Sequence, residues 1–241
     1  CTDVYNKTSK ISRAIIEPIG RLGSVPIPMI GTSFSNPEDL GIHNLSEKNG
    51  QVYTCRAGFI DIAHVRKAAD WTKYLGEKTY EHLMNNDTEF LFSFKEPSKY
   101  FVKLSYPENW GSLKLEEKEQ IAKDISVELG QYFTCNGVTW HEMLTWFGYK
   151  SYGFFSEFHS AFSYEDIFSD ILGVSIAGKV LRNREYNFNK DVTLALDLEL
   201  KELGAQASQV AEHTAKKLKG KWYSGSCYPF IDMKKRNFDI G

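Results

Sequence analysis

The sequence predicts an α+β protein dominated by helices, a single domain with a small antiparallel sheet. Apolar residues recur at helical spacing over most of the chain after residue 60, which favours several helices. Strand-like alternation is short. It is clearest in residues 90–94 and 100–106, where EPSK supplies the turn of a hairpin. The chain has 241 residues, of which 42% are hydrophobic, so it can bury a sizeable core.

Three segments of the chain differ in composition. Residues 1–50 are rich in Gly, Pro, Ser and Asn, which predicts an extended N-terminal arm with short turns and no core element. Residues 51–222 form the predicted globular α+β domain, which opens with a strand over 51–56. Residues 223–241 are predicted to be an irregular C-terminal tail packed on that domain.

Helical periodicity predicts the remaining elements. The expected helices span residues 61–84, 115–148, 163–182, 191–203 and 208–219, with a break in the first at Gly76. Gly130 and Gly137 within the second helix indicate close backbone packing or a kink. One flank of that helix is apolar, the pattern of an amphipathic helix, and consists of Ile121, Ile125, Leu129, Tyr132, Phe133, Trp140, Met143, Leu144 and Phe147.

Charge and hydropathy exclude two classes of partner. The formal net charge is −2, and no long basic block is present, so we expect no nucleic-acid partner. No apolar run reaches the roughly 18–20 residues that span a bilayer. We therefore expect membrane contact only through a lipid anchor at the N-terminus.

The four cysteines bear on the compartment. None forms a CxxC pair, which argues against a zinc knuckle. The opening CTDVYNKTSK resembles a bacterial lipoprotein after signal-peptide removal, with the lipid on Cys1; the alternative is a chain that begins at Cys by chance. Either way we expect an extracytoplasmic protein, which is periplasmic, an outer-membrane lipoprotein or secreted. Without the lipid, two disulfides can form.

The first candidate site is Trp140-His141-Glu142. Zinc peptidases carry HExxH, but Thr145 occupies the position of the second His, so the motif is incomplete. The structural alternative places His141 and Glu142 at the polar edges of the helix. As a functional assignment, we predict His141 as a metal ligand and Glu142 as a general base.

The second candidate is SAFSYEDIFSD, in which Glu165 and Asp166 are predicted metal ligands. A capping box from Ser163 to Asp166 explains both acids without function. Asp170 lies one turn after Asp166, and a nearby cation would offset that like-charge pair. Such oxygen ligands suit magnesium, calcium or manganese, whereas added histidines favour zinc or iron.

The third candidate is GFIDIAHVRKAADW. Asp61 is a predicted metal ligand and His64 a predicted catalytic residue, presented after a strand. The alternative is that Asp61 is an N-cap and His64 the third helical residue. Cys135 is a further candidate, either a nucleophile beside an imidazole or, as its position inside a helix favours, a buried inert thiol.

Aromatic residues surround these acids. Most are expected in the core, but a few exposed beside carboxylates would form a groove for a glycan, a peptide or a small molecule. The residues assigned to this ligand surface are Trp140, Trp146, Tyr149 and Tyr164.

Three segments carry a family resemblance: QVYTCRAGFIDIAHVRKAADWT, WHEMLTWFGYKS and SAFSYEDIFSDILG. Together they resemble an exported bacterial family of unknown function, DUF4056, over residues 50–222. The resemblance implies export and lipid anchoring, and it carries over no catalytic residue.

Three functions are therefore compared. The first is a hydrolase of the cell envelope that uses a divalent metal, zinc or another, and it predicts that the named acids and histidines converge. The alternative is a non-catalytic envelope protein that binds a glycan or a protein through its aromatic loop. The third is a thiol enzyme that uses Cys135.

Overall fold

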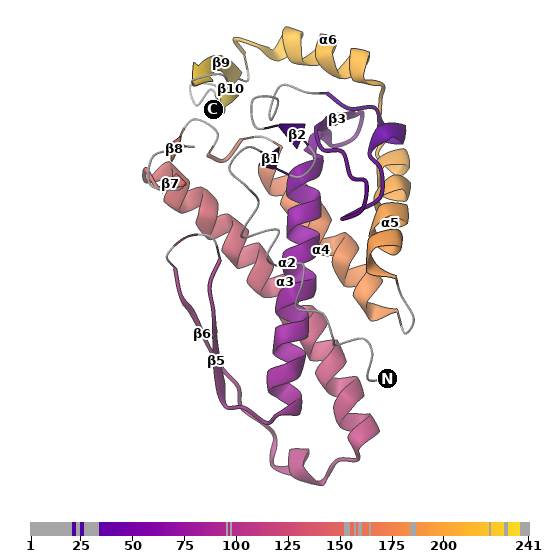
Figure 1. Cartoon of the computed structure of the whole chain (residues 1–241), viewed down its shortest axis with the longest axis vertical. Coiled ribbons are helices and arrows are strands. Elements are labelled where there is room, and N and C mark those ends of the chain that lie inside the picture. The colour runs from indigo at the N-terminus through magenta and orange to yellow at the C-terminus, as the bar shows by residue number, and fades with distance from the viewer. Residues whose placement is uncertain are drawn as a thin grey trace.

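A computed structural model describes residues 21–22, 25–26, 34–94, 96, 98–151, 155–156, 158, 161–163, 165–183, 187–221, 223–228 and 231–236 (Figure 1). Cys1 and Tyr164 lie outside these residues. The described part confirms a helix-dominated α+β fold with small antiparallel sheets.

The helices are α2 (Ile62–Met84), α3 (Leu115–Trp146), α4 (Asp166–Arg182), α5 (Phe188–Glu202) and α6 (Ser208–Leu218). The strands form antiparallel pairs: β1 (Arg21–Leu22) with β2 (Val25–Pro26), β3 (Gln51–Thr54) with β4 (Gly58–Asp61), β5 (Glu89–Phe92) with β6 (Tyr100–Lys103), β7 (Lys150–Ser151) with β8 (Phe155–Ser156), and β9 (Tyr223–Tyr228) with β10 (Ile231–Arg236). Short 3-10 helices span Pro37–Asp39 and Glu108–Ser112. The β5–β6 hairpin confirms the hairpin predicted for residues 90–94 and 100–106.

Helices α2, α3 and α4 pack on one another at the centre of the molecule (Figure 1). The main apolar cluster joins these helices to β3, β4 and α5. Its fully or nearly fully buried members include Val52, Ile60, Val65, Leu172, Ile176, Val192 and Leu196. A second cluster lies where the inner face of the β5–β6 hairpin covers α2 and α3, with Trp71, Leu75, Phe90 and Phe92 buried.

Two glycines set how closely α2 and α3 approach. A Cβ atom at Gly130 would lie 2.6 Å from the carbonyl oxygen of Thr72 and 2.9 Å from the amide nitrogen of Gly76. Because neither Gly130 nor Gly76 has a side chain, the backbones of α3 and α2 pack directly on each other. The predicted break at Gly76 is therefore wrong: α2 continues through it, and the glycine serves the helix crossing.

The buried face of α3 is not its apolar flank. It carries small and polar residues, namely Ala122, Ser126, Val127, Gly130, Thr134, Gly137, Glu142 and Thr145. Six residues of the apolar flank are exposed instead: Ile121 (39%), Ile125 (39%), Tyr132 (61%), Trp140 (42%), Met143 (40%) and Phe147 (85%). Glu142 was assigned to a polar edge as the structural alternative, and it is buried.

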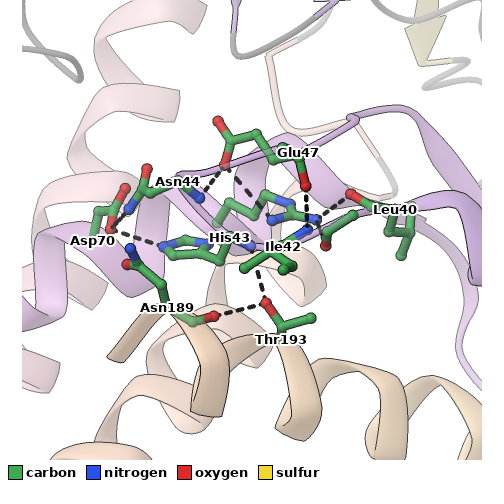
Figure 2. Close-up of polar contacts among 11 residues, drawn as sticks. Leu40, Ile42, His43, Asn44, Glu47, Asp70, Asn189 and Thr193 are labelled. Atoms are coloured by element: carbon green, nitrogen blue, oxygen red, sulfur yellow. Dashed lines mark hydrogen bonds and ion pairs between the residues drawn. The ribbon is translucent and has the colours of Figure 1, made fainter. Parts of the chain in front are cut away.

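Residues 34–50 belong to the domain, which corrects the prediction of an arm without core elements. Leu40 and His43 are buried. Figure 2 shows His43 reaching Asp70 of α2, with its Nε2 atom 2.9 Å from Asp70 Oδ1, while the His43 amide donates to Thr193 of α5. Arg66 of α2 donates to the carbonyl oxygen of Leu40 at 2.7 Å. Composition did not reveal these long-range contacts.

The C-terminal tail also differs from the prediction. Residues 223–228 and 231–236 pair as an antiparallel hairpin instead of remaining irregular. Strand β4 (Gly58–Asp61) was missed as well, because the sequence predicted only one strand in this region, over residues 51–56. Gly58 has a positive φ of 73°, which allows the chain to turn and pair back on β3.

Candidate functional site

The start of α2 positions the first pair of candidate residues. Asp61 caps the helix, and its Oδ1 atom accepts hydrogen bonds from the amides of Ala63 (2.8 Å) and His64 (3.4 Å). This confirms the N-cap alternative, with His64 at the third helical position. The cap leaves Asp61 Oδ2 3.3 Å from His64 Nδ1. Capping and pairing with the imidazole are therefore compatible roles of one carboxylate.

The start of α4 brings a second carboxylate to the same imidazole. Asp166 Oδ1 lies 3.7 Å from His64 Nε2, so the ring stands between Asp61 and Asp166. Ser169 fixes this arrangement, because its hydroxyl accepts from the Asp61 amide at 2.9 Å and donates to the carbonyl oxygen of Glu165 at 2.5 Å. Two helix N-termini, which favour anionic side chains, thus meet at His64.

Helix α4 begins at Asp166, three residues later than predicted, with Glu165 at the N-cap position. Ser163 is therefore not the N-cap, although its side chain does hydrogen-bond to Asp166. Glu165 makes no side-chain cap. Its Oε1 atom accepts from Gln51 Nε2 at 2.6 Å instead. Helix capping alone does not account for these two acids.

Helix α3 contributes Glu142 near its C-terminal end. Glu142 interacts electrostatically with Asp166 and Asp170, and its Oε2 atom accepts from the Phe162 amide at 2.6 Å. The side chains of Asp61 and Asp166 are 12% and 8% exposed, whereas the His64 side chain is 27% exposed. Glu142, Glu165 and Asp170 are buried as well. We call this set the His64 cluster, and its members are Asp61, His64, Glu142, Glu165, Asp166 and Asp170.

Burial and charge shift the pKa values within the cluster. Burial raises the pKa of Asp166 well above its usual value, and it raises the pKa of Asp170 to about 6. Burial alone would lower the pKa of His64, but the carboxylates of Asp166 and Asp61 outweigh it and hold that pKa well above its usual value. The excess of negative charge is thus balanced by bound protons.

The pKa of Asp61 is shifted in the opposite direction, below its usual value. Burial acts to raise its pKa, but the His64 imidazolium and the hydrogen bonds from the Ala63 and His64 amides together lower it. The cluster therefore contains a carboxyl group whose pKa is lowered, Asp61, beside one whose pKa is raised, Asp166. Carboxyl groups whose environments separate their pKa values are suited to divided acid and base roles.

The other predicted residues occupy neighbouring positions. His141 Nδ1 pairs with Glu96 Oε1, and the ring lies edge-on to Tyr149. Trp140 donates from Nε1 to Ser98 Oγ at 2.9 Å, and Trp146 packs on Phe158 with ring centroids 5.2 Å apart. His141 thus pairs with Glu96 and contacts Tyr149.

Two residues of this region, Asp170 and Lys67, were not assigned to the site from the sequence. Asp170 was noted for its spacing but was not assigned to the site, and the structure places it beside His64 and Glu142. Lys67, one turn after His64, interacts with both Asp170 and Glu96. The sequence holds no signal for Lys67, because its partners come from α4 and from the turn between β5 and β6.

The residues around Cys135 do not favour a thiol nucleophile. Cys135 lies inside α3, and burial together with Asp170 raises the pKa of its thiol. A nucleophilic cysteine needs the opposite shift. Among the cysteines whose side chains the structure describes, Cys55 and Cys135 are free thiols.

Metal ligation requires a particular spacing of donors. Among the side chains that the structure describes, no group of three or more His, Cys, Asp or Glu residues is placed to hold a metal ion. In the same part of the chain, no helix combines the length and apolar character needed to cross a bilayer.

The structure thus defines a helix-dominated α+β protein with a buried histidine–carboxylate cluster. The chain belongs to DUF4056, a family described as proteins of unknown function, whose model matches residues 30–240. The match extends beyond the 50–222 range of the resemblance. No curated protein and no solved structure matches the chain. Export and lipidation of Cys1 stay predictions.

Proposed function

We propose that the protein is a hydrolase whose reaction centre is the His64 cluster. The observation that carries this proposal is the convergence of Asp61, Asp166 and Asp170 on one partly exposed imidazole, with Glu142 of α3 close to the two carboxylates of α4. Ionising several carboxylates in a low-dielectric interior is costly, so such a cluster is rarely kept for stability alone. The alternative, a non-catalytic binding protein, predicted an exposed aromatic patch and no convergence of acids and imidazoles. His141 pairs with Glu96 outside the cluster, and Trp140 is 42% exposed.

The roles follow from the positions of the side chains. Glu142 is the general base that takes a proton from water and then gives it to the leaving group. His64 is held in place by Asp61, and Asp166 lies on the other side of its imidazole ring. Hydrolysis then consumes one water molecule: its hydroxyl joins the electrophilic atom, and its proton leaves with the departing group.

A divalent cation is the proposed cofactor, and Asp166, Asp170 and His64 are its proposed ligands. These three side chains would have to draw together on binding, because no three such donors among the described residues are placed to hold a metal. The cation would replace the protons that now balance the cluster, polarise the scissile bond and lower the pKa of bound water. His141, an earlier candidate ligand, is omitted because it pairs with Glu96. Since the ligands must lose protons, cation affinity should rise as the pH increases through about 6, where Asp170 titrates.

Metal content and binding test the cofactor. We expect the native protein to bind zinc, manganese or magnesium by titration calorimetry at pH 7.5, and the Asp166→Asn, Asp170→Asn double variant to lose at least about tenfold in affinity. Asp87→Asn is the matched control, because Asp87 pairs with His82 at the far end of α2. Equal affinity in the native and double-variant proteins would remove the metal from the proposal.

Activity tests the reaction centre. Chromogenic ester, phosphoester and glycoside substrates, each assayed with and without added metal, should reveal one class that the native protein cleaves. Glu142→Gln should lower kcat by about 10²–10⁴, whereas Glu96→Gln, outside the His64 cluster, should have a smaller effect. Full activity of a folded Glu142→Gln protein would exclude Glu142 as the base.

A further inference from the structure

The exposed residues of α3 form one narrow stripe along the helix. From Ile121 onward, and apart from Asp124, the exposed positions are Ile121, Ile125, Glu128, Tyr132, Asn136, Trp140, Met143 and Phe147, the last of which caps the helix. We call these eight residues the α3 stripe. Their average spacing of about 3.7 residues keeps them on one side of the helix. Six of the eight are apolar or aromatic.

The rest of the α3 surface is covered by the protein itself. Gly130 packs on α2, and Gln131 donates to the Val174 carbonyl oxygen of α4 at 3.2 Å. Gly137 contacts Phe94, and Phe133 packs in the cluster of the β5–β6 hairpin. Other elements thus fill three sides of the helix, and the α3 stripe lies on the side that stays exposed. Soluble monomers seldom expose a long apolar stripe of this kind.

The spacing of the stripe is symmetric. Its successive intervals are 4, 3, 4, 4, 4, 3 and 4 residues, an order that is the same in both chain directions. If two copies of α3 pack antiparallel with their twofold axis level with residue 134, every stripe residue meets another stripe residue. Ile121 then faces Phe147 of the second copy, and Ile125 faces Met143. This match is what a self-complementary, isologous interface requires.

The centre of that pairing is polar and its ends are apolar, and between them Glu128 of one copy faces Trp140 of the other. Tyr132 of one copy faces Asn136 of the other, on both sides of the axis. The Asn136 amide nitrogen already donates to the Tyr132 carbonyl oxygen of its own helix at 2.8 Å, so its side-chain oxygen is turned to accept from the opposite Tyr132 hydroxyl. A central hydrogen-bonded pair with apolar flanks fixes the register of such helices.

The stripe also has the area that a dimer needs. Aromatic side chains bury about 150–250 Å² each, so the exposed fractions of Tyr132, Trp140 and Phe147 offer on the order of 400 Å² per copy. The three aliphatic side chains add on the order of 200 Å². The sum approaches the roughly 800 Å² per partner of a standard interface and corresponds to a reversible dimer.

We propose that the protein forms a symmetric dimer in which the α3 stripes of two copies pack antiparallel about residue 134. Full-length native protein should show a reversible monomer–dimer equilibrium by sedimentation velocity between about 1 and 100 µM. Ile125→Lys and Met143→Glu should each weaken that dimer at least about tenfold, because each buries a charge against an apolar side chain. Both residues are exposed in the monomer, so both variants should fold.

Mixing the two variants tests the register. In the antiparallel pairing, Lys at position 125 of one copy meets Glu at position 143 of the other, so the mixture should dimerise although neither variant does so alone. Leu198→Lys, at an exposed leucine of α5, is the control and should leave the native dimer unchanged. A native protein that is monomeric at about 100 µM, or a mixture no more dimeric than its components, would overturn the proposal.

Discussion

The two sides of α3 differ in a way that inverts the usual amphipathic pattern. Its inner side packs on α2 and α4 through small and polar residues such as Gly130, Thr134 and Glu142. Its outer side, the α3 stripe, carries Ile125, Met143 and Phe147 in contact with solvent. Periodicity identifies two unlike faces of a helix, but it does not determine which of them faces the core of the same chain.

Close backbone packing explains the inner side. Where Gly130 meets Gly76, no large side chain fits between the helices, and the short interhelix distance leaves space only for small residues further along. The polar groups on this side then converge on a shared interior, where the His64 cluster forms. The apolar residues of α3 are left on the outer side, where a second copy of the chain can bury them.

The largest effect is expected from filling the contact between the glycines. Gly130→Val would drive two methyl groups into the Thr72 and Gly76 backbone, so the free energy of unfolding should fall by about 3 kcal/mol or more. Denaturant titration measures this change. The control is Gly111→Val, since a Cβ atom at Gly111 has no neighbour within 4 Å and should cost no more than about 0.5 kcal/mol. A small loss for Gly130→Val would mean that the helices can separate at little cost.

The next effect is a pH dependence of stability that arises on the inner side. The pKa of Asp170 rises from 3.8 to about 6 on folding, so the folded protein binds more protons than the unfolded chain between these values. Stability therefore falls as the pH increases through this window, by about 3 kcal/mol from this residue. Asp170→Asn removes that contribution.

Unfolding free energies at several pH values between 4 and 7 measure this contribution. The native protein should lose stability relative to Asp170→Asn as the pH rises, whereas Asp87→Asn, in the partly exposed pair with His82, should follow the native curve. Parallel curves for the native protein and Asp170→Asn would show that Asp170 does not bind its proton more tightly in the folded state.

A smaller effect compares matched apolar truncations on the two sides. Val127→Ala removes buried methyl groups and should lower the unfolding free energy by about 2 kcal/mol. Ile125→Ala, two residues away on the outer side, should change the stability of the monomer by less than about 0.5 kcal/mol and weaken only the dimer. Thermal unfolding at low protein concentration measures the stability of the monomer for both variants. Equal losses would place Ile125 in the monomer core.

The smallest effect concerns a thiol between the two sides. Because burial and Asp170 raise the pKa of Cys135, its alkylation by iodoacetamide at pH 8 should be at least about tenfold slower than that of the exposed Cys55. Peptide mass spectrometry of partially alkylated protein measures the two rates. The Asp170→Asn substitution should increase the alkylation rate of Cys135 and leave the alkylation rate of Cys55 unchanged. A fast-reacting native Cys135 would revive the thiol-enzyme hypothesis.

Local signals in the sequence accounted for much of the fold. Alternation over residues 90–106 predicted the hairpin, and apolar periodicity predicted each described α-helix to within a few residues, although not the two short 3-10 helices. Asp61 is an N-cap because a short acidic side chain can reach the free amides of the first turn, which requires no distant partner. Where the physical cause is local, sequence patterns were sufficient.

The candidate site could be predicted only in part. Asp61, His64, Glu142, Glu165 and Asp166 were named from their chemistry, and the structure places all five in the His64 cluster. Asp170 and Lys67 were not assigned, because their roles arise from side chains on other elements. His141 and Glu142 are adjacent in the chain yet have different partners, since neighbouring helical residues point in different directions.

The sequence by itself determined which segments become helices and strands, where α2 begins, and which acids and histidines are available for chemistry. Only the tertiary structure decided that the apolar side of α3 faces outward and that residues 34–50 join the domain. The reason is that burial depends on contacts between segments far apart in the chain. A pair of glycines more than 50 residues apart can set such a contact without leaving a periodic pattern.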